Sequence, residues 1–198
     1  MKKKALFAAV MGITMCAGTG FAAPATNYDA GAVTVEAGMS VAPDMQINGF
    51  SGDDKTRHYA GATVGLGSNF ALQYKYADNK ASNVGMRMQE FNLNYQAGKN
   101  TYIYAGNLNV KGTSAASGIS DNRVQVGVKY VASAGDKTNW WVGGAVGDDL
   151  WRAEIGGSYA LAPNVDWDLS YQYTDAKNVD DRVDVKTRGL YTGLTFKL

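Results

Sequence analysis

The residue best suited to acid–base catalysis is His58, the only histidine in the chain. Ser51, Asp53 and Asp54 lie close to it in sequence, and a hydroxyl or carboxyl group beside an imidazole is the arrangement that hydrolases use. The spacing does not define such a geometry, so the alternative is a histidine at the end of a strand with no catalytic role. We therefore expect that the protein is not an enzyme.

Three pairs of adjacent aspartates could hold a divalent cation, namely Asp53-Asp54, Asp148-Asp149 and Asp180-Asp181. Carboxylate oxygens suit calcium and magnesium, but none of the pairs has the spacing of an EF-hand, and charged pairs at loop tips are commonly only solvated. The single cysteine, Cys16, cannot form an internal disulfide and falls short of a zinc site. The sequence predicts no metal and no cofactor.

A larger group of charged residues lies in segments where apolar and polar residues alternate. A period of two is typical of strands, so these charges share one face of a sheet and the apolar residues the other. Inside a closed barrel they could form ion pairs across the lumen or line a narrow aqueous path. The group is Glu36, Lys75, Glu90, Arg123, Lys129, Arg152, Glu154, Asp166 and Asp168.

The first 25 residues have the pattern of a secretory signal peptide. Lys2–Lys4 precede an uncharged stretch that ends in Ala23-Pro24-Ala25, so we expect cleavage after Ala25 and a barrel domain over 26–198. A membrane anchor is the alternative, but the apolar part is short for a span of about 20 residues. Cleavage removes three lysines and the cysteine, which changes the net charge from +1 to −2. A near-neutral chain offers no basic surface for nucleic acid.

The alternation predicts an all-β protein with ten strands. In the clearest one, Val124, Val126 and Val128 alternate with polar residues or glycine, as a strand with two unlike faces requires. The strands are expected near 31–41, 57–67, 69–77, 86–97, 100–110, 122–132, 139–147, 150–161, 164–174 and 186–198. Without the hairpin at 147–149 there would be eight. Either even number fits a closed antiparallel up-and-down transmembrane β-barrel.

The connections between these strands are alternately short and long. Short ones end near residues 69, 100, 139 and 164, and the longer ones span 42–57, 78–85, 111–121 and 175–185. Short turns on one side and long loops on the other are typical of bacterial outer-membrane barrels, with the short turns and both termini in the periplasm.

Aromatic residues gather near the two ends of the predicted strands, with aliphatic residues between them. Two aromatic girdles match the two interfaces of a bilayer, whereas a soluble β-sandwich would favour aromatics in the strand middles. The expected girdle residues are Phe70, Tyr74, Tyr76, Tyr95, Tyr102, Tyr130, Trp140, Trp151, Tyr159, Trp167, Tyr171, Tyr173 and Phe196.

The last strand, with Leu190, Leu194, Phe196 and Leu198 on one face, resembles the C-terminal signal that the barrel-assembly machinery recognises. It ends in leucine, where that pattern prefers phenylalanine or tryptophan. In length, patterning and topology the chain after residue 25 resembles the small porin-like and opacity-type outer-membrane barrels. The resemblance implies the barrel fold and contact with outer-membrane lipids and lipopolysaccharide, and it brings no catalytic motif.

Two functions agree with these features. The first is a small porin-like barrel with a narrow, charge-lined lumen for ions or small solutes, widened by inward glycines at Gly38, Gly61, Gly65, Gly127, Gly156 and Gly193. The alternative is a non-conducting surface or structural barrel whose outer loops mediate adhesion or envelope contacts. Because a barrel of about eight strands is just wide enough for side chains, we expect no wide pore.

Overall fold

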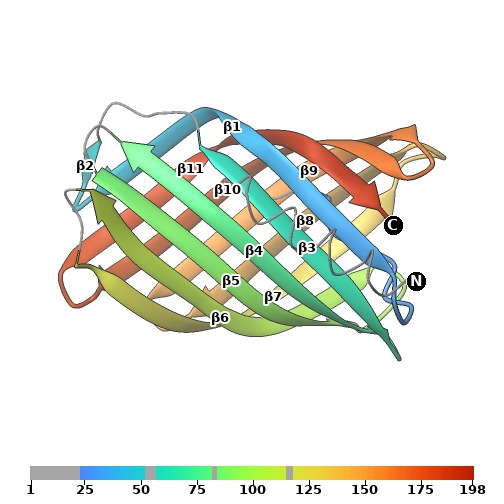
Figure 1. Cartoon of the computed structure of the whole chain (residues 1–198), viewed down its shortest axis with the longest axis horizontal. Helices are drawn as coiled ribbons and strands as arrows, with labels where there is room; N and C mark the ends of the chain where they lie inside the picture. Colours follow the sequence, from blue (N-terminus) through green and yellow to red (C-terminus); the bar gives the residue numbers. More distant parts are fainter. Residues whose placement is uncertain (1–22, 52–56, 82–83, 115–117) are drawn as a thin grey trace, which may run out of the picture.

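Ten antiparallel strands close into a barrel in the computed structural model, which describes residues 23–51, 57–81, 84–114 and 118–198 (Figure 1). Each strand pairs with the next along the chain, and β1 pairs with β11 to close the ring. The bounds are β1 Val33–Ile47, β3 His58–Gly67, β4 Phe70–Ala81, β5 Val84–Gln96, β6 Thr101–Ser114, β7 Ser120–Ser133, β8 Thr138–Gly147, β9 Leu150–Ala162, β10 Val165–Val179 and β11 Val183–Lys197; the two-residue β2, Phe50–Ser51, only extends the edge of β1. The ten-strand prediction is confirmed, including the hairpin at Gly147.

The two faces of the sheet have opposite chemistry, as the alternation predicts. In β7, Val124 is 68% exposed on the outside, whereas Arg123 and Gln125 are buried on the inside. A soluble protein would bury the valines and expose the charges. The inverted arrangement requires an apolar solvent outside, so this is a barrel of the transmembrane type. No helix long and apolar enough to cross a membrane occurs in the described part of the chain.

The predicted boundaries are wrong at the end of the barrel opposite the C-terminus. β1 continues to Ile47, β10 continues to Val179 and β11 begins at Val183, so most of the loops expected at 78–85 and 175–185 are strand. In these extensions the alternation is reversed, because apolar residues such as Val185 face inward and polar ones such as Lys186 face outward. A polar outer face there indicates that the strands extend beyond the lipid.

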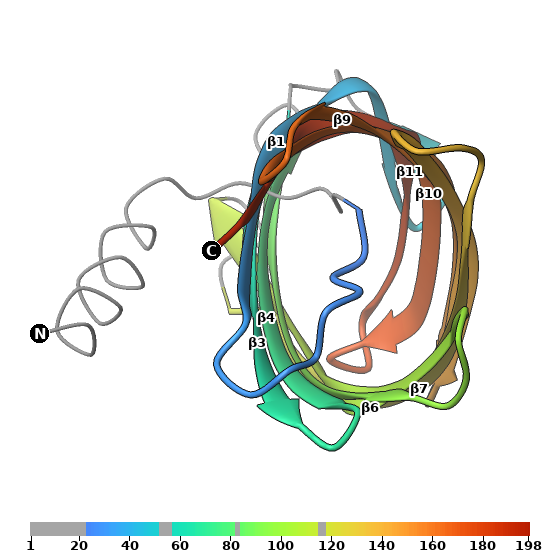
Figure 2. The ribbon, with the colours of Figure 1, turned by 90° about the vertical axis from the view of Figure 1, so that its right-hand side faces the viewer.

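The chain before β1 enters the barrel at the end where the C-terminus lies. We call residues 23–32 the mouth segment; Figure 2 shows it running inside the ring of strands and then turning over the rim into β1. Backbone hydrogen bonds hold it to β3, from Gly31 N to Gly65 O (2.9 Å), from Gly65 N to Ala32 O (2.8 Å) and from Gly67 N to Tyr28 O (2.9 Å). This segment has no strand periodicity, and the sequence did not predict its position.

Candidate functional site: the barrel lumen

Three layers of side chains occupy the lumen between the mouth and the opposite end of the barrel, which we call the outer end. The outermost is an apolar layer in which the side chains are almost fully buried. Its members are Met45, Met86, Met88, Leu108, Val110, Leu150, Ala176, Val179 and Val185. They lie at the ends of the strands opposite the mouth segment, where the alternation is reversed, so they face inward. The sequence does not predict this layer, because the alternation places apolar residues on the lipid face.

Below the apolar layer is an ionic layer, formed by Glu36, Lys75, Glu90, Lys129, Arg152 and Glu154. In two of its ion pairs the partners lie on second-neighbour strands. Lys75 Nζ of β4 is 3.5 Å from Glu36 Oε1 of β1, across Gly61 of β3. Lys129 of β7 pairs in the same way with Glu154 of β9, across Gly143 of β8. Because glycine has no side chain, Gly61 and Gly143 leave room for each ion pair on the inner face of the intervening strand.

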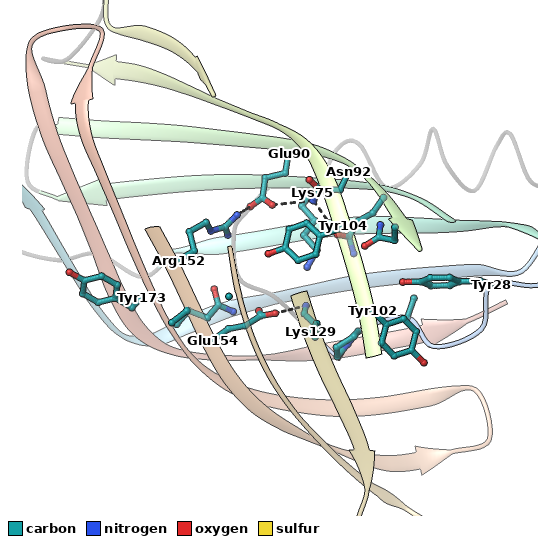
Figure 3. Close-up of a pocket in the computed structure, with 17 residues that line it drawn as sticks. Tyr28, Lys75, Glu90, Asn92, Tyr102, Tyr104, Lys129, Arg152, Glu154 and Tyr173 are labelled. Carbon is teal, nitrogen blue, oxygen red and sulfur yellow. Dashed lines mark hydrogen bonds and ion pairs between the residues drawn. The ribbon is translucent and has the colours of Figure 1, made fainter. Parts of the chain in front are cut away.

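The third ion pair crosses the lumen. Arg152 Nη1 of β9 lies 2.7 Å from Glu90 Oε1 of β5, four strands away around the barrel, as Figure 3 shows. Gln125 links both partners, since its Nε2 donates to Glu90 Oε2 (3.1 Å) and its Oε1 accepts from Arg152 Nη1 (3.2 Å). Gln125 Nε2 also lies 3.0 Å from Asn92 Oδ1. Opposite charges thereby neutralise one another inside the barrel, where unpaired charges are costly.

The inward glycines do not widen the lumen as expected. A side chain at Gly61 would collide with the carboxylate of Glu36, and one at Gly127 with the ring of Tyr104. At Gly156 the obstacle would be the indole of Trp141, which is fully buried. Large side chains on neighbouring strands therefore occupy the space above these glycines.

The mouth segment closes the third layer. Tyr28 packs edge-on against Tyr102, with ring centroids 5.5 Å apart, and the pair lies close to Ala25 and the buried Trp141. Burial raises the pKa of the Tyr28 hydroxyl above its ordinary value, which keeps the group neutral. Tyr102 is therefore not a girdle residue, a correction to the prediction. In β6 it shares the inward face with Leu108, because residues an even number apart lie on the same side of a strand.

The remaining lumen residues lie near the two ends of the barrel. Asp166 and Asp168 are buried near the mouth, where Asp166 pairs with Lys197 (2.6 Å) and Asp168 accepts from Thr195 Oγ1 (2.7 Å). Arg123 lies at the outer end, away from the ionic layer. It pairs with Asp121 (2.7 Å) and donates to the backbone carbonyls of the turn at 148–149. Its contacts are those of a structural residue at the β8–β9 hairpin.

The other predicted girdle residues lie on the outer surface in two belts. Phe70 and Tyr95 contact each other near the mouth (centroids 4.9 Å apart), and Trp151 and Tyr173 near the opposite end (5.0 Å). Exposed rings are Phe70, Tyr74, Tyr95, Tyr130, Trp140, Trp151, Tyr159, Trp167, Tyr171 and Phe196, whereas Tyr76 and Tyr173 are half-buried. Aliphatic side chains such as Val126 and Ile155 are exposed between the belts.

The structure describes only some of the candidate catalytic and metal-binding residues. His58 is an exposed residue at the start of β3, and Asp53 and Asp54 lie outside the described residues. Asp149 and Asp180 adopt positive φ values of 49° and 54° in tight turns, which aspartate tolerates. Within the described ranges no group of three or more His, Cys, Asp or Glu residues could hold a metal ion.

No protein-family model and no curated protein matches the sequence. Among solved structures, Neisserial surface protein A is 18% identical over 85% of this chain and 99% of its own, with a TM-score of 0.48. The outer-membrane protein AlkL, determined in DMPC bilayers, is 11% identical over 91% and 96%, with a TM-score of 0.42. A KdgM porin in complex with disordered oligogalacturonate is 6% identical over 83% and 98%, with a TM-score of 0.42.

Taken on its own residues, the chain has the architecture expected of small outer-membrane barrels: a closed ten-strand ring with aromatic belts, a lipid-facing band and a filled lumen.

Proposed function

We propose that the protein is a bacterial outer-membrane barrel whose lumen is sealed at rest, so that it passes neither ions nor solutes. Both termini and the turns near residues 68, 98, 135 and 163 lie in the periplasm, and the C-terminal strand is the part that the barrel-assembly machinery recognises. The observation that carries this proposal is the filling of the lumen, in which an apolar layer lies directly above an ionic layer whose charges are paired with one another.

The burial of the charged groups supports a sealed lumen. The side chains of Glu36 and Lys75 are each 7% exposed, and even Glu154, the most accessible of the ionic layer, is only 12% exposed. In an aqueous pore, water would contact such groups, because a channel conducts only where ions keep their hydration or replace it. The apolar layer above them adds a constriction that excludes water.

A sealed lumen places the protein's interactions on its outer surface. Above the outer aromatic belt the strand extensions carry outward charges, including the Arg188–Asp44 pair (2.6 Å) and the Lys186–Asp175 pair (3.5 Å). Arg87 lies over the ring of Tyr76, 5.6 Å from its centroid. We name this set the polar collar, and we propose that its basic members contact the phosphorylated head groups of lipopolysaccharide. Among the outer connections that the structure describes in full, 148–149 and 180–182 are short.

Planar-bilayer recording of refolded protein tests the seal. Insertion is established separately by the different gel mobilities of unboiled and boiled samples, since closed barrels resist SDS at room temperature. Inserted protein should give no conductance steps under conditions in which an established porin does. Reproducible steps from the unaltered protein would overturn the proposal.

A narrow pore is the second candidate, and one observation favours it. On the mouth side of the ionic layer is a cavity lined by charges of both signs, including Lys75, Glu90 and Arg152, and bounded by Pro24 and Tyr28 of the mouth segment. The mouth segment is not a strand of the barrel, so its release would open the cavity to the periplasm. If the protein is such a pore, deleting residues 26–31 should produce or enlarge conductance steps.

A further inference from the structure

The charges near the mouth do not balance. Of the five carboxylates predicted for the lumen, four have a cationic side chain as partner: Glu36 with Lys75, Glu90 with Arg152, Glu154 with Lys129, and Asp166 with Lys197. Among the described residues Asp168 has no such partner, although it is 1% exposed and lies near the carboxylates of Glu36 and Asp166. A buried, uncompensated carboxylate is strongly unfavourable.

The group that approaches Asp168 from the mouth segment is the backbone nitrogen of Ala23. Its N–H donates to the Asp168 carboxylate, while Thr195 Oγ1 donates to Oδ2 (2.7 Å) and Oδ1 has no hydrogen-bond partner. Ala23 is itself buried in the cluster with Trp141 and Tyr102. If this nitrogen were a chain terminus, it would be an ammonium group with more N–H donors and the missing positive charge.

The sequence permits a terminus at this position. Signal peptidases require small residues at the first and third positions before the cut. A cut between Ala22 and Ala23 has Ala22 and Gly20 there, whereas a cut after Ala23 would have Phe21. The cut after Ala25 also satisfies the rule, but it would remove Ala23 and leave Asp168 without that donor.

We propose that the signal peptide is removed between Ala22 and Ala23, and that the new α-ammonium group forms a buried ion pair with Asp168 at the barrel mouth. The ion pair fixes the mouth segment in the lumen only after processing, because the uncleaved chain has a neutral amide at that nitrogen. The pairing is independent of whether the lumen conducts.

N-terminal sequencing and intact mass of protein extracted from the outer membrane test the position of the cut. The expected first residue is Ala23. A chain that begins at Thr26, or at any other residue, would overturn the proposal.

The ion pair is tested on a chain that begins at Ala23, compared with the same chain acetylated at its α-amine. Acetylation, and the variant Asp168→Asn, should each speed unfolding in urea about tenfold or more, and the two changes together should have no larger effect than either alone. Asp166→Asn is the matched control, because its effect, through loss of Lys197, should add to that of acetylation. Equal unfolding rates with and without acetylation in the unsubstituted chain would show that the ammonium has no partner. That comparison needs no variant to fold.

Discussion

The apolar layer and the ionic layer of this lumen solve the same packing problem in different ways. The apolar layer fills the outer end of the lumen with methionine, leucine and valine side chains that need no specific partner. The ionic layer fills the middle with side chains of both signs, each of which requires a particular partner at a particular distance. The difference teaches that the lumen of one barrel can be occupied by apolar packing at one level and by paired charges at another, so the two levels should respond differently to substitution.

The largest effect is expected from breaking a pair in the ionic layer. Glu90→Ala leaves the Arg152 guanidinium buried without its main carboxylate, which should lower the free energy of unfolding by about 3–5 kcal/mol. Urea unfolding of vesicle-inserted protein, followed by tryptophan fluorescence, measures the change. The double variant Glu90→Ala/Arg152→Ala should recover part of the loss. A double variant that loses the sum of both single effects would contradict a specific pairing.

A smaller loss is expected from the apolar layer. Leu108→Ala creates a cavity among apolar neighbours and should cost about 3 kcal/mol. Leu108→Met keeps the volume and should cost less than about 1.5 kcal/mol. The same unfolding measurement compares the two. If the apolar layer requires only that its volume be filled, methionine should be tolerated at this position and alanine should not. Equal losses of stability for both variants would show that the layer also requires the shape of leucine.

Substitution at a glycine between paired charges tests how closely the ionic layer is fitted. Gly61→Ala pushes the Glu36 carboxylate away from Lys75 and should cost about 1–2 kcal/mol. Gly157→Ala is the control, because an added Cβ there would meet only Asn139 O at 3.4 Å. If both variants unfold at the same urea concentration, the space above Gly61 is not required.

The smallest effect is expected outside the lumen. Arg188 pairs with Asp44 (2.6 Å) but is 53% exposed in the polar collar, and exposed pairs contribute little because water screens them. Arg188→Ala should leave the unfolding midpoint unchanged. The same variant, together with Lys186→Ala, should weaken binding to vesicles that contain lipopolysaccharide. Unchanged binding would contradict the role proposed for the collar.

Much of the fold was predictable because a period of two, kept over most of the chain, leaves few architectures. The strand extensions were missed for a physical reason. Beyond the lipid, residues such as Lys186 face water outside and residues such as Val185 pack inside. The apolar residues of the alternation therefore face the lumen there, and not the lipid. Alternation alone does not indicate where that reversal occurs.

The ionic layer was predictable as a set and not as pairs. Charged residues such as Arg123 and Arg152 both lie on inward faces, yet only Arg152 takes part in the layer. Which carboxylate each cation meets depends on register and on closure of the ring, and neither is visible in one strand. The positions of Tyr102 and of the mouth segment were not predictable for the same reason. Tyr102 packs against Tyr28, and the mouth segment is held by β3, and neither contact is visible in the sequence.

The ion pairs that cross a glycine strand have a consequence for assembly. Lys75 meets Glu36 only if β3 is aligned with both β1 and β4, and Lys129 meets Glu154 only if β8 is aligned with β7 and β9. A slip of one residue would turn one member of a pair toward lipid. Each pair thus depends on the alignment of three consecutive strands. A chain whose strands pair in the wrong register therefore loses an ion pair, and is less stable, before the ring has closed. The ionic layer of the finished barrel would therefore also favour, during insertion, the correct alignment of its strands.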